Sequence, residues 1–445
     1  MNRFHSENIP IFSGKVILGV ACVLVATLVI DSSIGKVYYF GINQPSFSSK
    51  IIVFGIIVSI CIVGQYFTLE YVRSRSREIR VLHLSSLHRA VAITQYALFA
   101  MLVLVILQIV FTARYQLLVL TAVVGVSYLL ATILMGLLAK RFLLWHRTNK
   151  NFIVLLYGLA SASIAVNTLS TFSYLTIILS EQPVYVLQHT GFVSPYFVVS
   201  LTTAAISNTY SISSIVSFML SWAATSLLIR QYYPKISTIK YWIILLIPLA
   251  YFLFQFQPLF LNIFSGLITS QPVVFSILYT LIFTASKPVG GLIFASVFLN
   301  MARRIPRKKN LKNYLIMSAL GFILLFVSNQ AIVLASAPYP PFGLATVSFV
   351  GLSTYLIFVG IYSSAISVAQ DAELRKIVRT TVKEEFDLLR NIGTSQLEED
   401  IQQKVTQVTT KLSQSITQRT GIEPSLMDDD IKDYCKEVLQ EIRKK

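Results

Sequence analysis

Long uninterrupted apolar stretches constrain the fold of this chain more than any other feature. Several exceed the roughly 18 residues that a helix needs to cross the hydrocarbon core of a bilayer. Of the 445 residues, 55% are hydrophobic and 13% are charged, whereas a soluble domain carries about 25% charged residues. Because only helices and closed barrels satisfy their backbone groups in lipid, these runs predict an all-α polytopic integral membrane protein.

Ten apolar segments fit transmembrane helices. The first is expected to be a retained span, because no small-residue cleavage site of a signal peptide follows it. The predicted spans cover residues 15–32, 51–69, 91–112, 116–138, 152–180, 210–229, 241–257, 272–301, 313–336 and 342–367.

Basic residues alternate between the connections. Lys and Arg gather in four of them, residues 70–90, 139–151, 230–240 and 302–312, while the intervening connections hold few or none. The positive-inside rule then places both termini in the cytoplasm and the spans in the cell membrane. Several arginines are expected to anchor the cytoplasmic ends, and they could also bind anionic lipid or acidic patches of the tail. These arginines are Arg73, Arg75, Arg77, Arg80, Arg303, Arg304 and Arg307.

The charges divide the chain into two regions. Residues 1–370 hold 24 basic and only five acidic side chains, whereas residues 371–445 hold 13 basic and 15 acidic ones. We therefore expect a ten-span transmembrane domain over 1–370 and a cytoplasmic amphipathic helical tail over 371–445. The basic excess belongs to the membrane domain, where it reflects topology, so no nucleic-acid partner is expected.

The tail sequence predicts helices. The last span is expected to continue into the cytoplasm until Gly393 and Thr394 interrupt it. An apolar stripe at helical spacing follows, and a last amphipathic segment after the break at 420–425 carries Ile431, Val438 and Ile442. Either the tail helices pack on one another or on the basic loops, or they bind a protein partner or a second copy. The stripe consists of Leu397, Ile401, Val405, Val408, Leu412 and Ile416.

Lys287 is the only basic residue deep in a predicted span. It is expected near the middle of a helix over 273–299, where a lysine costs about 3 kcal/mol on insertion scales. Pro288, Gly290 and Gly291 follow it. The proline indicates a kink, and the glycines permit a close approach of another helix or a break. The segment could also form two half-helices of the kind found at transporter sites. Lys287 could bind backbone carbonyls at the break, pair with Asp31, or line a cavity that receives an anion.

Few other side chains offer chemistry. Asn167, Asn329 and Gln330 are the neutral polar candidates for a ligand or pathway beside Lys287 and Asp31. The spans lack the carboxylates and histidines that a membrane hydrolase or metal site needs, and no phosphate-binding glycine loop is present. We expect no enzyme activity, no metal and no cofactor.

Three functions fit this pattern. The first choice is a sensor or signalling-type protein whose membrane domain is coupled to the tail. A secondary transporter with an anion or solute site at Lys287 is the second choice, and a structural subunit of a membrane complex is the third. The sequence does not identify the ligand.

Overall fold

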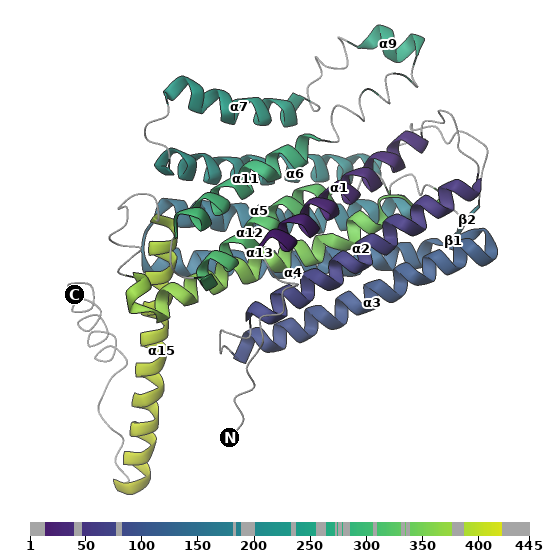
Figure 1. Cartoon of the computed structure of the whole chain (residues 1–445). Coiled ribbons are helices and arrows are strands. Elements are labelled where there is room, and N and C mark those ends of the chain that lie inside the picture. The colour runs from purple at the N-terminus through teal and green to yellow at the C-terminus, as the bar shows by residue number, and fades with distance from the viewer. Residues whose placement is uncertain are drawn as a thin grey trace.

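The structure is a computed structural model, and it confirms an all-α membrane-type architecture. It describes residues 14–39, 47–76, 82–180, 184–187, 201–232, 237–254, 264–271, 274, 278, 285–305, 309–330, 334, 339–375 and 387–420. Helices run side by side as a bundle, and one long helix, α15, crosses the end of that bundle (Figure 1). The described elements are α1 Gly14–Tyr39, α2 Phe47–Ser76, α3 Leu82–Thr112, β1 Arg114–Gln116, α4 Leu117–Thr148, α5 Phe152–Ser180, β2 Tyr185–Leu187, α6 Leu201–Tyr232, α7 Thr238–Phe254, α9 Ser265–Ser270, α11 Ser286–Arg304, α12 Lys309–Ser328, α13 Leu344–Gln370 and α15 Asp387–Thr420.

Seven of the described helices are long and apolar enough to cross a membrane: α2, α3, α4, α5, α6, α12 and α13. Their composition indicates a lipid bilayer environment. The predicted spans 15–32 and 241–257 coincide with shorter apolar helices, α1 and α7. Most of the predicted span 272–301 before Ala285 lies outside the described residues, so the total of ten spans stays a prediction.

Helix α13 is the centre of the bundle. Its hydrophobic window is buried along its whole length inside the protein, and it packs mainly against α12 and α4. Glycines allow this close packing, because a Cβ on Gly321 or Gly360 would lie 2.7 Å from backbone atoms of the opposing helix. The helix therefore contacts other helices rather than lipid, which makes it the structural link between the two ends of the bundle.

The connection between α5 and α6 contains a short strand that the sequence did not predict. Tyr185–Leu187 pairs antiparallel with Arg114–Gln116 as a two-stranded ribbon, with Tyr115 opposite Val186. The residues from Leu201 onward already belong to α6. The sequence prediction missed this ribbon because three-residue strands carry too short an alternation to be recognised.

The start of the tail also differs from the prediction. Helix α13 ends at Gln370, and Asp371 is extended, so the last span does not continue directly into the tail. The Asp371 carboxylate accepts the Leu374 N–H at 3.0 Å, which starts a new helical turn as an N-cap does. Helix α15 then runs through Gly393 and Thr394, so the predicted interruption at these two residues is wrong.

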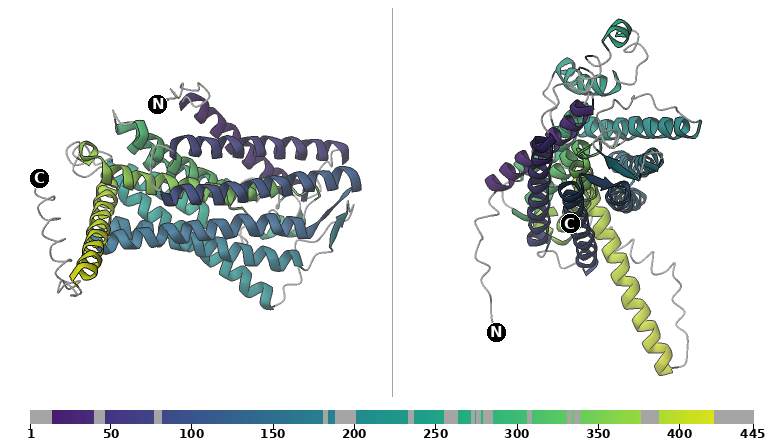
Figure 2. Two further views of the ribbon diagram at one scale, coloured as in Figure 1. Left: turned by 90° about the horizontal axis from the view of Figure 1, so that it is seen from below. Right: turned by 90° about the vertical axis from the view of Figure 1, so that its right-hand side faces the viewer.

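Gly393 has a packing role instead. A Cβ at this position would lie 2.4 Å from Cγ1 of Val368 in α13, which is closer than two carbon atoms can approach. The absence of a side chain lets α15 lie directly against α13 as it crosses the end of the bundle, as Figure 2 shows from two further sides. Glycine in a helix does not end it when tertiary packing compensates for its low propensity.

Candidate functional site

Lys287 lies at the start of a helix. Helix α11 begins at Ser286, so Lys287 is its second residue and not the middle residue of a continuous span. Pro288 falls in the first turn, where its missing N–H would have no helical partner in any case. Pro288 therefore does not kink α11, and the alternative of two half-helices stays a prediction that extends beyond the described residues. The predicted preceding half-helix lies largely outside them.

Gly290 and Gly291 bring α11 close to two neighbouring helices. A Cβ on Gly290 would lie 2.3 Å from the Phe218 ring of α6, and a Cβ on Gly291 would lie 2.8 Å from Cβ of Phe326 in α12. Phe218 and Phe326 themselves meet edge to face at 6.0 Å. The two glycines thus serve helix packing rather than a break in the chain.

The Lys287 ammonium binds the end of α12. Its Nζ donates to the carbonyl oxygen of Asn329 at 3.2 Å, and it lies 5.7 Å from the centre of the Tyr210 ring. Asn329 directly follows the last residue of α12, where carbonyls without helical partners create a negative end. Among the described carboxylates none pairs with Lys287, so a backbone carbonyl and an aromatic face compensate its charge.

A buried amide chain extends from this lysine. The Asn329 side-chain amide donates to Oδ1 of Asn167 at 2.9 Å, and Asn167 in turn donates to Oγ of Ser213 at 3.1 Å. Tyr128 OH donates to Oδ1 of Asn329 at 3.3 Å. The predicted candidates Lys287, Asn167 and Asn329 thus come together and join α4, α5, α6, α11 and α12. We call these residues, with Tyr210, the lysine cluster.

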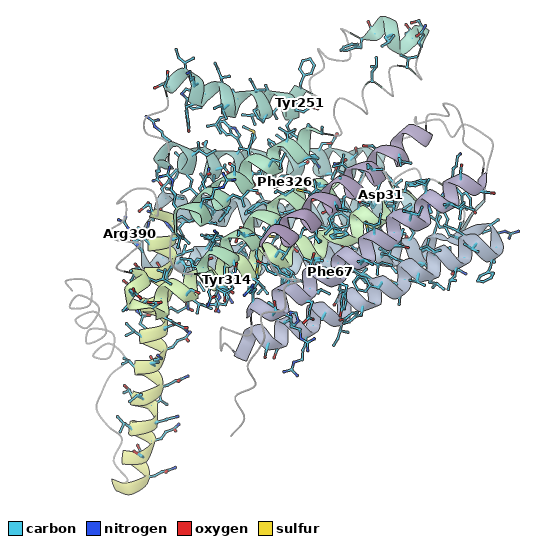
Figure 3. All side chains as sticks on the ribbon, viewed as in Figure 1. Asp31, Phe67, Tyr251, Tyr314, Phe326 and Arg390 are labelled. Atoms are coloured by element: carbon cyan, nitrogen blue, oxygen red, sulfur yellow. The ribbon has the colours of Figure 1, made fainter. Side chains whose placement is uncertain are left out.

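Asp31 does not pair with Lys287, because it holds the start of α13. Its Oδ1 accepts the Gly343 N–H at 2.9 Å, and its Oδ2 accepts the Thr346 N–H at 3.0 Å and the Thr346 hydroxyl at 2.7 Å. The side chain is fully buried on α1 within the bundle, where Figure 3 labels it. A carboxylate at a helix N-terminus satisfies free N–H groups and is favoured by the helix dipole.

The two intramembrane charges therefore flank one connection. Lys287 binds the residue after α12, and Asp31 binds the residues that begin α13. Gln330 is buried in this connection, and its N–H donates to the carbonyl of Ser328 at 2.8 Å. Gly343 has a φ of 90°, a conformation that glycine adopts without strain. Sequence reasoning found both charges but missed Thr346, Tyr128, Tyr210 and Ser213, because hydroxyl groups are common in apolar helices.

A second buried polar chain reaches α13 from α2 and α3. Gln95 donates through Nε2 to Oε1 of Gln65 at 2.8 Å, and Gln65 donates to Oγ of Ser348 at 2.7 Å. All three side chains are buried. Hydrogen bonds of this kind hold helices together inside a membrane domain, where each is worth about 0.6 kcal/mol on average.

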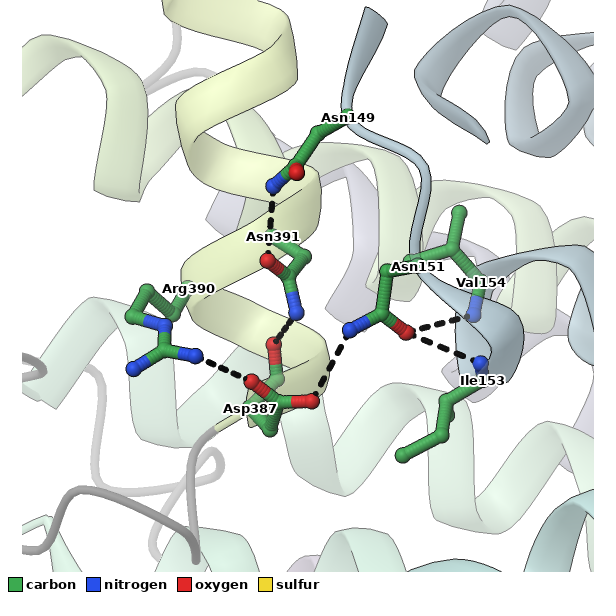
Figure 4. Close-up of polar contacts among 7 residues, drawn as sticks. All are labelled: Asn149, Asn151, Ile153, Val154, Asp387, Arg390 and Asn391. Atoms are coloured by element: carbon green, nitrogen blue, oxygen red, sulfur yellow. Dashed lines mark hydrogen bonds and ion pairs between the residues drawn. The ribbon is translucent and has the colours of Figure 1, made fainter. Parts of the chain in front are cut away.

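The other end of α13 meets α15. Asn149 and Asn151, in the short connection between α4 and α5, donate to Asn391 at 2.7 Å and to Asp387 at 3.0 Å. Asn151 also accepts the N–H groups of Ile153 and Val154 and so caps α5. These contacts, shown in Figure 4, fix the first turn of α15 on the end of the membrane domain.

Trp145 lies beneath the next turn of α15. Its indole N–H donates to Oε1 of Gln396 at 3.1 Å, and its carbonyl accepts the Ser395 hydroxyl at 3.0 Å. Arg141 pairs with Glu399 at 2.9 Å and lies 5.2 Å from the ring centre of Tyr362 in α13. We call these contacts, together with those of Asn149 and Asn151, the tail dock. The predicted tail helix thus packs on the membrane domain.

Four of the seven predicted basic anchors belong to the described residues, and they lie at the ends of two helices. Arg73 and Arg75 end α2, and Arg303 and Arg304 end α11. Arg73 pairs with Glu70 at 3.5 Å, and the Arg75 carbonyl accepts the Tyr314 hydroxyl at 3.2 Å. Arg77, Arg80 and Arg307 fall outside the described residues. Within the described ranges, no three His, Cys, Asp or Glu side chains are grouped to hold a metal ion.

Comparison with protein-family models, with curated proteins and with solved structures finds no match to this chain. The functional inference therefore depends on the lysine cluster, Asp31 and the tail dock alone.

Proposed function

We propose that this chain is a non-enzymatic membrane sensor of the signalling type, in which the state of the membrane domain is transmitted to a cytoplasmic tail. The observation that carries the proposal is the placement of α13. Asp31 holds one end of this buried helix, and α15 packs against the other end. A helix of this length spans about 40 Å, so it can link the lysine cluster region to the tail dock.

The orientation of the termini belongs to the same proposal. The helix ends that carry Arg73, Arg141, Arg230 and Arg303 lie at the end of the bundle where α15 docks. Under the positive-inside rule this end faces the cytoplasm, which puts α15 there too. The proposed location is the cell membrane.

A transporter is the second candidate, and one observation favours it. Lys287 lies at the positive N-terminal end of α11 and meets no described carboxylate, so both the helix dipole and the ammonium favour an anion. Against it, the Asn329 amide is already bonded to Tyr128 and Asn167. In this alternative, an anion would displace the Asn329 carbonyl from Lys287. A structural subunit of a membrane complex is the third proposal.

One experiment separates the three. The full chain with Trp222→Phe and Trp242→Phe retains Trp145 as its only tryptophan, in a position where it reports the tail dock. Proteoliposomes of short-chain and long-chain lipid are given acetate, benzoate, lactate or inorganic phosphate. Solute uptake and Trp145 emission are then recorded together.

A sensor changes Trp145 emission with lipid thickness or with one of these anions, without accumulating solute. A transporter accumulates an anion and loses that activity in Lys287→Met. Constant emission without uptake under every condition contradicts both proposals and leaves the structural subunit. Leu292→Met, an apolar change at an exposed position of the same helix, is the matched control for Lys287→Met.

A further inference from the structure

Two buried hydrogen-bond donors lie where α2 ends and α12 begins. Nε of Arg75, in the last turn of α2, and Nδ2 of Asn313, the fifth residue of α12, are buried and donate to no acceptor in the described part of the chain. The hydroxyl of Tyr314 (labelled in Figure 3) donates to the Arg75 carbonyl at 3.2 Å, so the two helix ends are in contact. Few buried donors in folded proteins lack an acceptor, which indicates that this junction can bind a group that accepts hydrogen bonds.

The charge of this junction is positive. Among the described carboxylates none pairs with Arg75, and Glu70, the only acidic residue of α2, pairs with Arg73 instead. Neither α11 nor α12 contains an acidic residue. The adjoining helix ends add Arg303, Arg304 and Lys312. A partly buried guanidinium without a carboxylate partner favours an anion as its ligand.

The donors fit a phosphate group. An arginine binds phosphate oxygens through two parallel N–H groups, and these charge-assisted hydrogen bonds are stronger than neutral ones. Asn313 adds a neutral donor, and the N-terminal end of α12 adds a favourable dipole. The side chains of Arg75 and Asn313 are both partly exposed, so rotation about their outer bonds turns the buried donors toward a ligand at the protein surface.

The position of Arg75 favours a phospholipid as the source of the phosphate. The segment of α2 that is apolar enough to cross a membrane is Ser48–Arg75, so Arg75 is its last residue. α2 exposes apolar side chains such as Ile60 and Phe67, as a helix that borders lipid does. Basic pockets between transmembrane helices bind anionic headgroups. The surrounding positive charge disfavours a headgroup that carries choline.

We propose that the junction of α2 and α12 binds the phosphate of an anionic phospholipid headgroup, with Arg75 and Asn313 as donors. Phosphate from solution would meet the same donors, so the test includes both sources. The site is more specific than the general attraction of basic connections to anionic lipid, because it assigns binding to Arg75 and not to Arg73. It does not depend on the proposed sensing function.

Lipid binding by two arginine variants tests the site. Native mass spectrometry of the full chain in a non-ionic detergent measures its affinity for dioleoylphosphatidylglycerol. Arg75→Gln should weaken this affinity about tenfold, because charge-assisted hydrogen bonds to the phosphate are lost. Arg73→Gln removes the same charge two residues earlier, from an exposed side chain that is paired with Glu70. This matched control should change the affinity by less than about twofold.

A second pair of variants leaves both arginines in place. Asn313→Ala removes the buried amide donor and should weaken binding about fivefold. Asn310→Ala changes an exposed amide near the start of the same helix and should have no effect. This comparison decides the question if Arg75→Gln does not fold.

Two further ligands identify the source of the phosphate. The parent should bind dioleoylphosphatidylglycerol more tightly than dioleoylphosphatidylcholine, and Arg75→Gln should lose that preference. Inorganic phosphate should not change the thermal stability of the lipid-free parent. If phosphate stabilised the parent but not Arg75→Gln, and the two lipids bound alike, the phosphate site would be supported and its lipid source overturned.

The remaining results overturn the proposal. Equal losses from Arg75→Gln and Arg73→Gln, or from Asn313→Ala and Asn310→Ala, would mean that binding follows surface charge and not this site. Absence of binding by both phosphatidylglycerol and inorganic phosphate would also overturn it. None of these assays measures sensing, so failure of the proposed function would leave the results intact.

Discussion

The two ends of α13 are held by different chemistry. At one end, fully buried Asp31 accepts three hydrogen bonds from Gly343 and Thr346. At the other end, α15 is held by amide contacts and by the Arg141–Glu399 pair, whose side chains are 33% and 24% exposed. Removing a hydrogen-bond partner costs more folding free energy when the remaining polar group is buried than when it is partly solvated. We call the Asp31 end the fixed end. The α15 end combines buried contacts of Trp145 with this partly solvated ion pair, and under the proposed function it is the end that is released.

The largest expected effect is at the fixed end. Asp31→Ala leaves the Gly343 and Thr346 N–H groups buried without an acceptor, whereas the Thr346 hydroxyl can still donate to the Leu28 carbonyl at 3.2 Å. The variant should lower the free energy of unfolding by about 3 kcal/mol. Asp31→Asn keeps one acceptor oxygen and should cost less. Thermal unfolding in detergent measures both, with Thr27→Val, a buried hydroxyl one turn earlier, as the control. Equal stability of Asp31→Ala and Thr27→Val would show that Asp31 does not hold α13.

A smaller effect is expected at the tail dock. Gly393→Val places side-chain atoms where Val368 already lies, and overpacking of this kind costs about 1–3 kcal/mol. It should loosen α15 and increase amide hydrogen exchange over 387–400 while α4 and α13 stay protected. Gly136→Ala adds a Cβ in open space and should leave exchange unchanged. If Gly393→Val matched Gly136→Ala, close contact between α13 and α15 would be refuted.

The lysine cluster should be less sensitive than Asp31. Lys287→Met removes one hydrogen bond to the Asn329 carbonyl, which directly follows α12, and one favourable charge–dipole interaction, together about 1 kcal/mol. The variant should unfold at a slightly lower temperature than Leu292→Met. If Lys287→Met lowered the unfolding temperature more than Asp31→Ala does, Lys287 would contribute more stability than Asp31. That result would contradict the assignment of Asp31 as the fixed end.

The smallest effect is expected from the ion pair of the tail dock. A double-mutant cycle with Arg141→Ala and Glu399→Ala should give a coupling energy of at most about 1 kcal/mol, because both side chains are partly solvated. The coupling should fall when the salt concentration is raised. A coupling unaffected by salt would mean that the pair is more buried than its exposure indicates.

Sequence patterns predicted the class of fold and singled out Lys287 and Asp31, two charged residues that lie within the helix bundle. Long apolar runs and alternating basic connections can be recognised within short windows of sequence. A charged residue inside such a run, such as Lys287 or Asp31, is then easily identified. The partners of those charges depend on which helix ends meet, and no local pattern specifies that Asp31 caps α13 or that Lys287 binds Asn329. Gly393 illustrates the same limit, since a glycine that ends a helix and a glycine that permits helix contact look alike in sequence.

The tail dock was only partly predictable. The amphipathic spacing of Leu397 to Leu412 indicated a helix, and this helix is present in α15. Its contacts with Asn149, Asn151 and Trp145 involve neutral side chains at the end of α4, which carry no distinctive spacing. These side chains bind α15 only because tertiary packing brings that helix against the end of α4.

Coupling between the two ends of α13 is the central claim, and Trp145 emission in Asp31→Asn tests it most directly. In the variant with Trp145 as the only tryptophan, weakening the fixed end should shift the emission of Trp145 toward that of a solvated indole, although Asp31 and Trp145 lie near opposite ends of α13. Gly393→Val should give the same shift, as a reference for a loosened dock. An Asp31→Asn spectrum identical to that of the parent, in protein that remains folded, would contradict the account.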